Sequence, residues 1–252
     1  MPYTMTISPD FKPDLISGWY IFNTWLQKSI GENIHLELVN NFSELDKLID
    51  SDKVDLIYAN PFDMSKLVRE KSFLPVTKPI GKVDEAVIII NSDSDIESVE
   101  SLKPGVKVSL TDAPDVNMVG AIMLESADIY GNDFEKVNCT NNITIAKNVI
   151  NGESEIGFML ADSFDELSSL VKKQLKPLIR SKIDLLHHTF LISPRLSEKF
   201  ESIQSALVAL VALDGDDKGK NLLNSLELEK WLAMETEEAE FMIDLIDTLQ
   251  PG

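Results

Sequence analysis

Apolar and polar positions along the chain predict strands and helices that alternate. Residues 3–7 form a short apolar strand, and a polar loop with two prolines follows it. The next segment carries apolar residues at helical spacing, which predicts one long amphipathic helix with a buried face. That face consists of Trp19, Phe22, Leu26 and Ile30, and Gly31 is a suitable residue to end the helix.

The same reading extends over the rest of the chain. Further strands are predicted at 35–39, 54–58, 73–78, 85–91, 106–110, 137–139, 156–160, 176–180 and 187–192. Helices are predicted from a Ser43 cap through Ile49 and at 61–70, 96–102, 116–127, 143–150 and 163–170. The remainder reads as helical, with breaks near Asp214–Gly215 and Ser225.

This alternation predicts an α/β fold built from mainly parallel sheets that helices cover on both faces. The pattern restarts near Glu85 and returns near His187, which predicts two connecting strands between two lobes. The first lobe would comprise residues 1–86 plus 190–252, and the second lobe residues 87–189.

Two strand-to-helix junctions are the strongest local signals. After the strand at 54–58, Asn60 is placed to cap a helix and Pro61 occupies its first position. A second junction runs from Val106 to Met118 in the other predicted lobe. Ligands of open α/β sheets bind beyond the carboxyl ends of strands, where helix N-termini point N–H groups at them. The two junctions therefore predict a cleft that closes on a small molecule.

Composition narrows the functional classes. The formal net charge of −19 argues against nucleic acid and anionic membrane surfaces, because both require a positive face. A single cysteine, Cys139, allows no intrachain disulfide and reads as a small core residue. Three histidines make a histidine-rich metal site unexpected, and adjacent His187 and His188 read as structural. No metal or cofactor is predicted.

No stretch of sequence reaches the roughly 18 apolar residues of a membrane span, so no membrane insertion is expected. Strand-forming residues follow Met1–Pro2 almost at once, without the basic and apolar regions of an export signal. The expected location is cytoplasmic for the sequence as it stands. It would be periplasmic or otherwise extracytoplasmic if an export signal had been removed.

Four segments together resemble the phosphonate/phosphate-type (PhnD-like) substrate-binding proteins of ABC transporters, a branch of the type II periplasmic binding fold. They are Ile7-Ser8-Pro9-Asp10 before the long helix, the Asp55–Phe62 junction, residues 90–108, and Leu191–Leu196 before the C-terminal helices. The resemblance covers nearly the whole chain. It implies two lobes joined by two hinge strands, which close on a ligand without catalysis.

The second junction departs from this family. Its phosphonate binders carry a Ser-Thr-Ser-type cluster at the start of a helix in the second lobe, whereas this chain reads Asp112-Ala113-Pro114-Asp115. A carboxylate about 4 Å from a phosphonate oxygen repels it by roughly 1–4 kcal/mol. A neutral or cationic ligand is therefore expected rather than a simple phosphonate. Alternatively, Asp112 and Asp115 only cap the helix.

The predicted ligand-binding residues lie at the ends of strands: Ser8, Asp10, Phe11, Asn60, Pro61, Phe62, Thr111, Asp112, Asp115, Asn117, Asn141 and Asp162. No catalytic residue is predicted, and the partner would be an ABC permease or a signalling protein. One alternative is a cytoplasmic enzyme of the menaquinone- or thiamine-pathway type, with only carboxylates as candidate acids or bases. Another is an interaction module whose cleft is filled by Phe11, Phe62 or Met64.

Overall fold

The computed structural model describes residues 2–131, 133–210 and 217–249, and these form two units. The chain builds residues up to Val83 into the first unit and passes into the second at Asp84. It returns to the first unit at His187 and stays in it through Ile246. Each crossing lies three residues before the limits predicted from the sequence.

The first unit contains a six-stranded sheet in the order β11-β4-β10-β3-β1-β2. Its strands are β1 (Tyr3–Ile7), β2 (Ile34–Leu36), β3 (Leu56–Ala59), β4 (Leu74–Pro79), β10 (Thr189–Ile192) and β11 (Trp231–Ala233). β1 pairs in parallel with both β2 and β3, whereas β10 runs antiparallel between β3 and β4. The strand that returns from the second unit therefore lies inside the sheet of the first.

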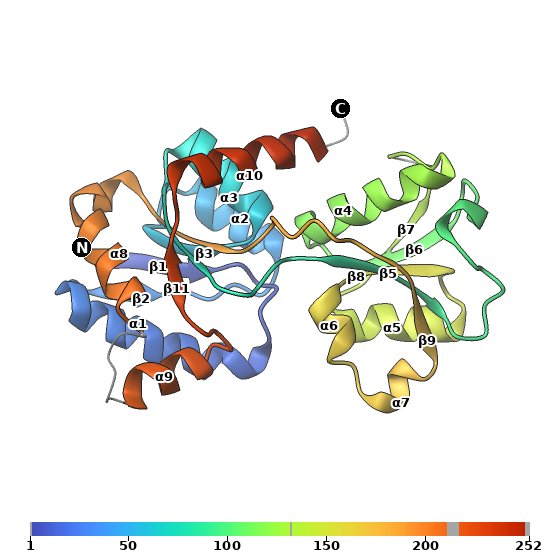
Figure 1. Ribbon diagram of the computed structural model, residues 1–252, viewed down its shortest axis with the longest axis horizontal. Coiled ribbons are helices and arrows are strands. Elements are labelled where there is room, and N and C mark those ends of the chain that lie inside the picture. Colours follow the sequence, from blue (N-terminus) through green and yellow to red (C-terminus); the bar gives the residue numbers. More distant parts are fainter. Residues whose placement is uncertain (1, 132, 211–216, 250–252) are drawn as a thin grey trace. The chain divides into compact units, whose positions relative to one another are not determined.

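Helices cover both faces of this sheet (Figure 1). They are α1 (Ile16–Ile30), α2 (Phe42–Asp50), α3 (Pro61–Lys71), α8 (Phe200–Val208), α9 (Asp217–Asn224) and α10 (Thr236–Leu249), with short 3₁₀ turns at Pro13–Leu15 and Pro194–Lys199. The apolar face predicted for α1 is buried, and Gly31 ends the helix with φ +70. Its Trp19 and Phe22 pack with Tyr58, Phe190 and Trp231 in an aromatic core.

The second unit contains a five-stranded sheet in the order β7-β6-β8-β5-β9. Its strands are β5 (Ala86–Asn91), β6 (Lys107–Leu110), β7 (Glu135–Asn138), β8 (Ile156–Leu160) and β9 (Leu175–Arg180). β6 pairs in parallel with β7 and β8, and β5 runs antiparallel to β8 and β9. In each sheet most strands point one way, and the strand after a chain crossing (β5 or β10) runs against its neighbours.

Helices lie on both faces of this second sheet as well (Figure 1). They are α4 (Pro114–Leu124), α5 (Asn142–Asn151), α6 (Ala161–Asp165) and α7 (Ser169–Lys172), with 3₁₀ turns at Val99–Ser101 and Glu125–Ala127. Gly120 and Gly157 permit close packing, since a Cβ on either would lie 2.5 Å from the side chain of Phe158 or Ile145. None of the helices in the described ranges combines the length and the apolar composition that a membrane span requires.

Several predicted elements need correction. α2 is capped by Asn41, which accepts a hydrogen bond from Glu44 N, and not by Ser43. The helix predicted at 96–102 is a single 3₁₀ turn, and that at 163–170 is two short helices, α6 and α7. β11 lies in a region predicted to be helical, because three residues carry too little periodicity to identify a strand. The break predicted at Asp214–Gly215 lies outside the described residues.

Candidate functional site

The carboxyl ends of β1 and β3 bring Ser8 and Asn60 together in the first unit. The register pairs Ile7 with Tyr58, and Ser8 N donates to Tyr58 O at 2.9 Å. Asn60 N in turn donates to Ser8 Oγ at 3.1 Å, and both residues are fully buried. A hydrogen bond therefore joins two predicted site residues that are 52 positions apart in sequence.

Asn60 begins α3 as the sequence predicted. Its side-chain Oδ1 accepts a hydrogen bond from Asp63 N at 2.8 Å, and Pro61 takes the first helical position, where no N–H is needed. Asn60 Nδ2 is buried and has no hydrogen-bond partner within the described part of the chain. This junction thus carries one unused donor beside the positive end of the α3 dipole.

Asp63, which follows the Asn60–Pro61 junction, is a buried carboxyl group beside Ser8. Its side chain accepts a hydrogen bond from Ser8 Oγ at 3.4 Å, and the residue is 4% exposed. Burial, followed by the negative charges of Asp10 and Asp46, raises the pKa of Asp63 to about 7. The first unit therefore places a group that titrates near neutral pH at the start of α3.

Asp10 has a partner that sequence reasoning missed. His188 Nε2 lies 3.2 Å from Asp10 Oδ1, with each side chain 12% exposed. The His188 ring also packs against Tyr58, at 5.0 Å between ring centroids. His188 immediately precedes β10, whose first residue pairs with Ala59. His188 therefore lies at the same end of the sheet as Asn60. Its place in that antiparallel register is the signal that would have identified it.

The other predicted residues of the first unit lie in the loop after β1 and at the start of α3. Pro61 is buried, and Phe62 and Phe11 are half-buried. Phe11 packs against the hydrophobic core of the unit. Met64, proposed as a residue that could fill a cleft, is instead fully buried.

In the second unit, Thr111 and Asn117 join the end of β6 to α4. Asn117 Nδ2 donates to Thr111 O at 2.8 Å, and Ala113 N donates to Thr111 Oγ1 at 3.4 Å. Asn117 Oδ1 is a buried acceptor with no hydrogen-bond partner among the described residues. The loop is thus held closed by its own side chains.

The start of α4 differs from the prediction. The helix begins at Pro114, two residues earlier than expected, and its N-cap is Ala113, whose side chain makes no cap hydrogen bond. Asp112 lies outside the helix and is exposed, whereas Asp115 lies in the first turn and is 2% exposed. Neither aspartate occupies the N-cap position, although the Asp115 carboxyl is close enough to the helix start to complement its dipole.

Asn141 and Asp162 follow β7 and β8, the neighbours of β6. Asn141 caps α5, with its Oδ1 accepting from Thr144 N at 2.9 Å, and is exposed at the surface. Asp162 lies in the first turn of α6 and is also exposed. Since β6, β7 and β8 are parallel, Thr111, Asn141 and Asp162 all follow the carboxyl ends of these strands and lie at one end of the sheet.

Clusters of three or more metal-ligating side chains are absent from the ranges that the structure describes. Arg180, the last residue of β9, supplies a cation at the same end of the second sheet as Thr111 and Asp162. It donates two hydrogen bonds of 2.8 Å to Asp165. These bonds lower the pKa of Asp165 below its ordinary value. The arrangement offers hydrogen-bonding and charged groups for binding, among them the Asp10–His188 acid–imidazole pair of the first unit.

Comparison with known proteins identifies the class. The sequence matches the family described as "ABC transporter, phosphonate, periplasmic substrate-binding protein" over residues 5–239. The chain belongs to this family, whose members are substrate-binding proteins and not enzymes. A search of curated proteins gave no match.

Solved structures share the two-lobed fold. PhnD1 from Prochlorococcus marinus, in complex with methylphosphonate, gives a TM-score of 0.79 at 12% identity, covering 98% of this chain and 97% of that one. XAC2383 from Xanthomonas citri, bound to ATP, gives 0.79 at 9% identity with the same coverage. The aliphatic sulphonate binding protein SsuA from Escherichia coli gives 0.68 at 13% identity, covering 98% and 87%. These similarities confirm the predicted type II periplasmic binding fold and lend no support to the enzyme or interaction-module alternatives.

Proposed function

We propose that this protein delivers a small solute to an ABC permease outside the cytoplasm, and that the group it recognises at the helix starts is neutral or cationic. Family membership supports the transport role. The strand ends that carry Ser8, Asn60 and Thr111, and the helix starts that follow them, are the expected ligand positions in open α/β sheets. Closure of the two units on the solute would provide binding without chemistry.

The observation that carries the ligand class is a buried carboxyl group in the first turn of α4. Anion sites at helix N-termini use N–H groups and hydroxyls that donate hydrogen bonds to the ligand. Here the residue in that turn is Asp115, which is 2% exposed, and the N-cap is Ala113, which has no hydroxyl. The positive end of the helix is therefore complemented from within the chain.

The first unit shows the same feature. Asp63 lies in the first turn of α3, and its pKa of about 7 leaves it partly ionised at neutral pH. Asp10 lies nearby with His188 as its partner. An oxyanion approaching within about 4 Å of either carboxylate would meet a repulsion of roughly 1–4 kcal/mol, comparable to the gain from one or two hydrogen bonds.

The ligand class can be tested by calorimetric titration with methylphosphonate, a polyamine, amino acids and nucleosides, preceded by a thermal-shift screen. A neutral or cationic compound should raise the melting temperature through mass action on the bound state, and methylphosphonate should not. Mass spectrometry after incubation should return the ligand unchanged. Tight binding of methylphosphonate to the unaltered protein would overturn the proposed ligand class.

Asp115→Asn provides the matched variant, because it removes the charge while preserving side-chain size. It should improve methylphosphonate binding at least about fivefold, following the repulsion estimated above. Asp112→Asn, in the same loop but exposed, should change that affinity much less. Equal effects of the two substitutions would contradict the role given to the buried carboxyl group.

A further inference from the structure

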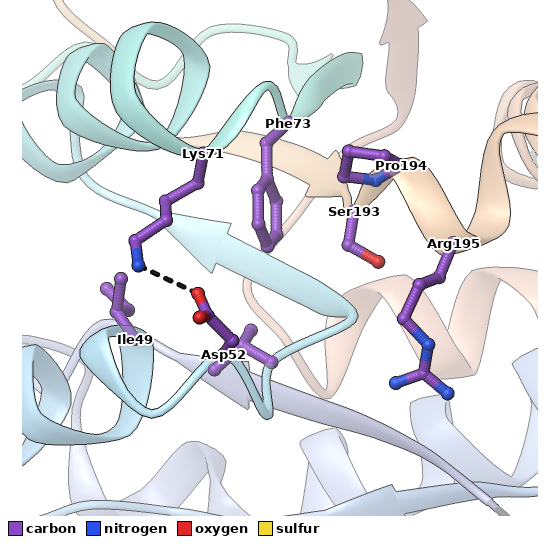
Figure 2. Close-up of a pocket in the computed structure, with 8 residues that line it drawn as sticks. Ile49, Asp52, Lys71, Phe73, Ser193, Pro194 and Arg195 are labelled. Atoms are coloured by element: carbon purple, nitrogen blue, oxygen red, sulfur yellow. Dashed lines mark hydrogen bonds and ion pairs between the residues drawn. The ribbon is translucent and has the colours of Figure 1, made fainter.

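Figure 2 shows the residues around a cavity of about 180 Å³ in the first unit. The cavity lies at the ends of the strands opposite those that carry Ser8 and Asn60. Val54 lies just before β3, Phe73 just before β4, and Ser193 just after the antiparallel β10. Those three positions lie at the same end of the sheet, beyond the first residues of β3 and β4, whereas Asn60 follows the last residue of β3. The cavity is therefore separate from the residues proposed to hold the transported solute.

Apolar side chains form much of the cavity lining. Ile49, Val54 and Phe73 are each less than one-tenth exposed, and Pro194 lies beside them. In Figure 2 the Phe73 ring stands between Lys71 on one side and Ser193 with Pro194 on the other. About 180 Å³ equals the volume of roughly six waters at ~30 Å³ each, which is room for a short alkyl or small aryl group.

Arg195 is fixed at one side of the cavity. Its NH1 contacts both oxygens of Asp55, at 2.9 Å and 3.2 Å, and its guanidinium lies 5.4 Å from the centroid of the Tyr3 ring. Asp55 is 1% exposed and also accepts from Ser193 Oγ at 3.2 Å. Arg195 is therefore a preorganised cation whose charge is largely matched by a buried carboxylate.

Lys71 and Asp52 form a different kind of pair at the other side of the cavity. Lys71 Nζ lies 2.7 Å from Asp52 Oδ1, as the dashed line in Figure 2 marks. The Lys71 side chain is 25% exposed, whereas that of Asp52 is 75% exposed. The ammonium is thus partly enclosed at the cavity, whereas its carboxylate partner is largely in contact with solvent. Exposed pairs of this kind contribute little stability, so a competing carboxylate can replace Asp52.

We propose that this cavity binds a small monocarboxylate, whose carboxylate replaces that of Asp52 at Lys71 and whose apolar body lies against Val54 and Phe73. Lys71 already forms an ion pair with the Asp52 carboxylate, so a carboxylate is a group that this ammonium binds. The apolar lining accounts for an alkyl or aryl body and disfavours a fully hydrated inorganic anion, which would gain nothing from that surface. Arg195 adds a second positive charge to the same lining.

The test is a ¹H–¹⁵N NMR titration with butyrate, following the amides of Phe73 and Ser193. Lys71→Gln should weaken butyrate binding at least about fivefold, and Asp52→Asn should strengthen it about threefold by removing the competing carboxylate. Lys66→Gln is the matched control, because Lys66 lies on the same helix, is 25% exposed and pairs with Asp46, yet does not line the cavity. It should leave the affinity unchanged.

Circular dichroism spectra would establish that each variant is folded before its affinity is compared. The proposal is overturned if butyrate shifts neither amide, or if Lys71→Gln and Lys66→Gln have equal affinities. It is also overturned if Asp52→Asn binds no more tightly than the unaltered protein. Inorganic phosphate that binds as tightly as butyrate would contradict the role of the apolar lining.

Discussion

Asp63 should make the stability of the protein fall as the pH rises toward neutrality. The residue is 4% exposed, and burial, followed by the negative charges of Asp10 and Asp46, raises the pKa of its carboxyl group from 3.8 to about 7. Each pKa unit corresponds to about 1.4 kcal/mol, so keeping this group ionised in the folded protein costs roughly 4 kcal/mol. Ser8 donates a hydrogen bond to it and Lys66 lies nearby, but both only partly offset burial.

The sign follows from proton binding in the two states. Between about pH 4 and pH 7 the unfolded chain has lost the Asp63 proton, whereas the folded protein retains it. The folded state binds more protons over this range, so the free energy of unfolding decreases as the pH rises. From about pH 5 to about pH 8 the Asp63 contribution should fall by roughly 3 kcal/mol.

Asp63→Asn removes this titration while preserving size and the acceptor for Ser8. We expect the variant to lose about 3 kcal/mol less stability than the unaltered protein between about pH 5 and about pH 8. Urea denaturation followed by circular dichroism at several pH values measures the difference. Asp14→Asn, at an exposed site, is the control and should follow the unaltered protein. Parallel pH curves for Asp63→Asn and the unaltered protein would refute the reasoning.

Three further substitutions test the packing and hydrogen bonds of the fold. Gly18→Ala should lower the melting temperature by several degrees, since its Cβ would lie 2.1 Å from the backbone oxygen of Ser225; a melting curve like that of the unaltered protein would contradict this contact. Glu85→Ala should speed hydrogen exchange at the amides of Ile183 and Asp184, which both donate to Glu85 Oε1 at 2.7 Å; unchanged exchange there would show that the carboxylate does not hold the loop. Asn60→Ala should cost about 1 kcal/mol in urea denaturation through loss of the α3 cap, and no loss would contradict that cap.

The parts of the fold predicted correctly are those with strong local signals. The apolar spacing from Trp19 to Ile30 identified α1, and the Asn60–Pro61 pair identified the start of α3. Elements with few residues or several competing caps were predicted poorly. Asn41 and Ser43 are both suitable cap residues, and only the backbone conformation selects Asn41.

The candidate site shows the same division between local and long-range information. Ser8 and Asn60 were predicted because each ends an apolar strand beside a turn signal. His188 was read as structural because its partner Asp10 is 178 positions away, and only the register of β10 brings them together. The raised pKa of Asp63 depends on burial and on charges from other elements, which no local pattern encodes.

The central position of β10 also has a consequence for synthesis of the protein. On the ribosome, β3 and β4 emerge long before β10, which is separated from β4 by all five strands of the second sheet. Until Thr189 to Ile192 appear, the nascent first unit has two unpaired strand edges where β10 will insert. The sheet of the second unit comes from one uninterrupted stretch of chain, from β5 to β9, and can complete its folding earlier, whereas the first unit closes its sheet only near the end of translation.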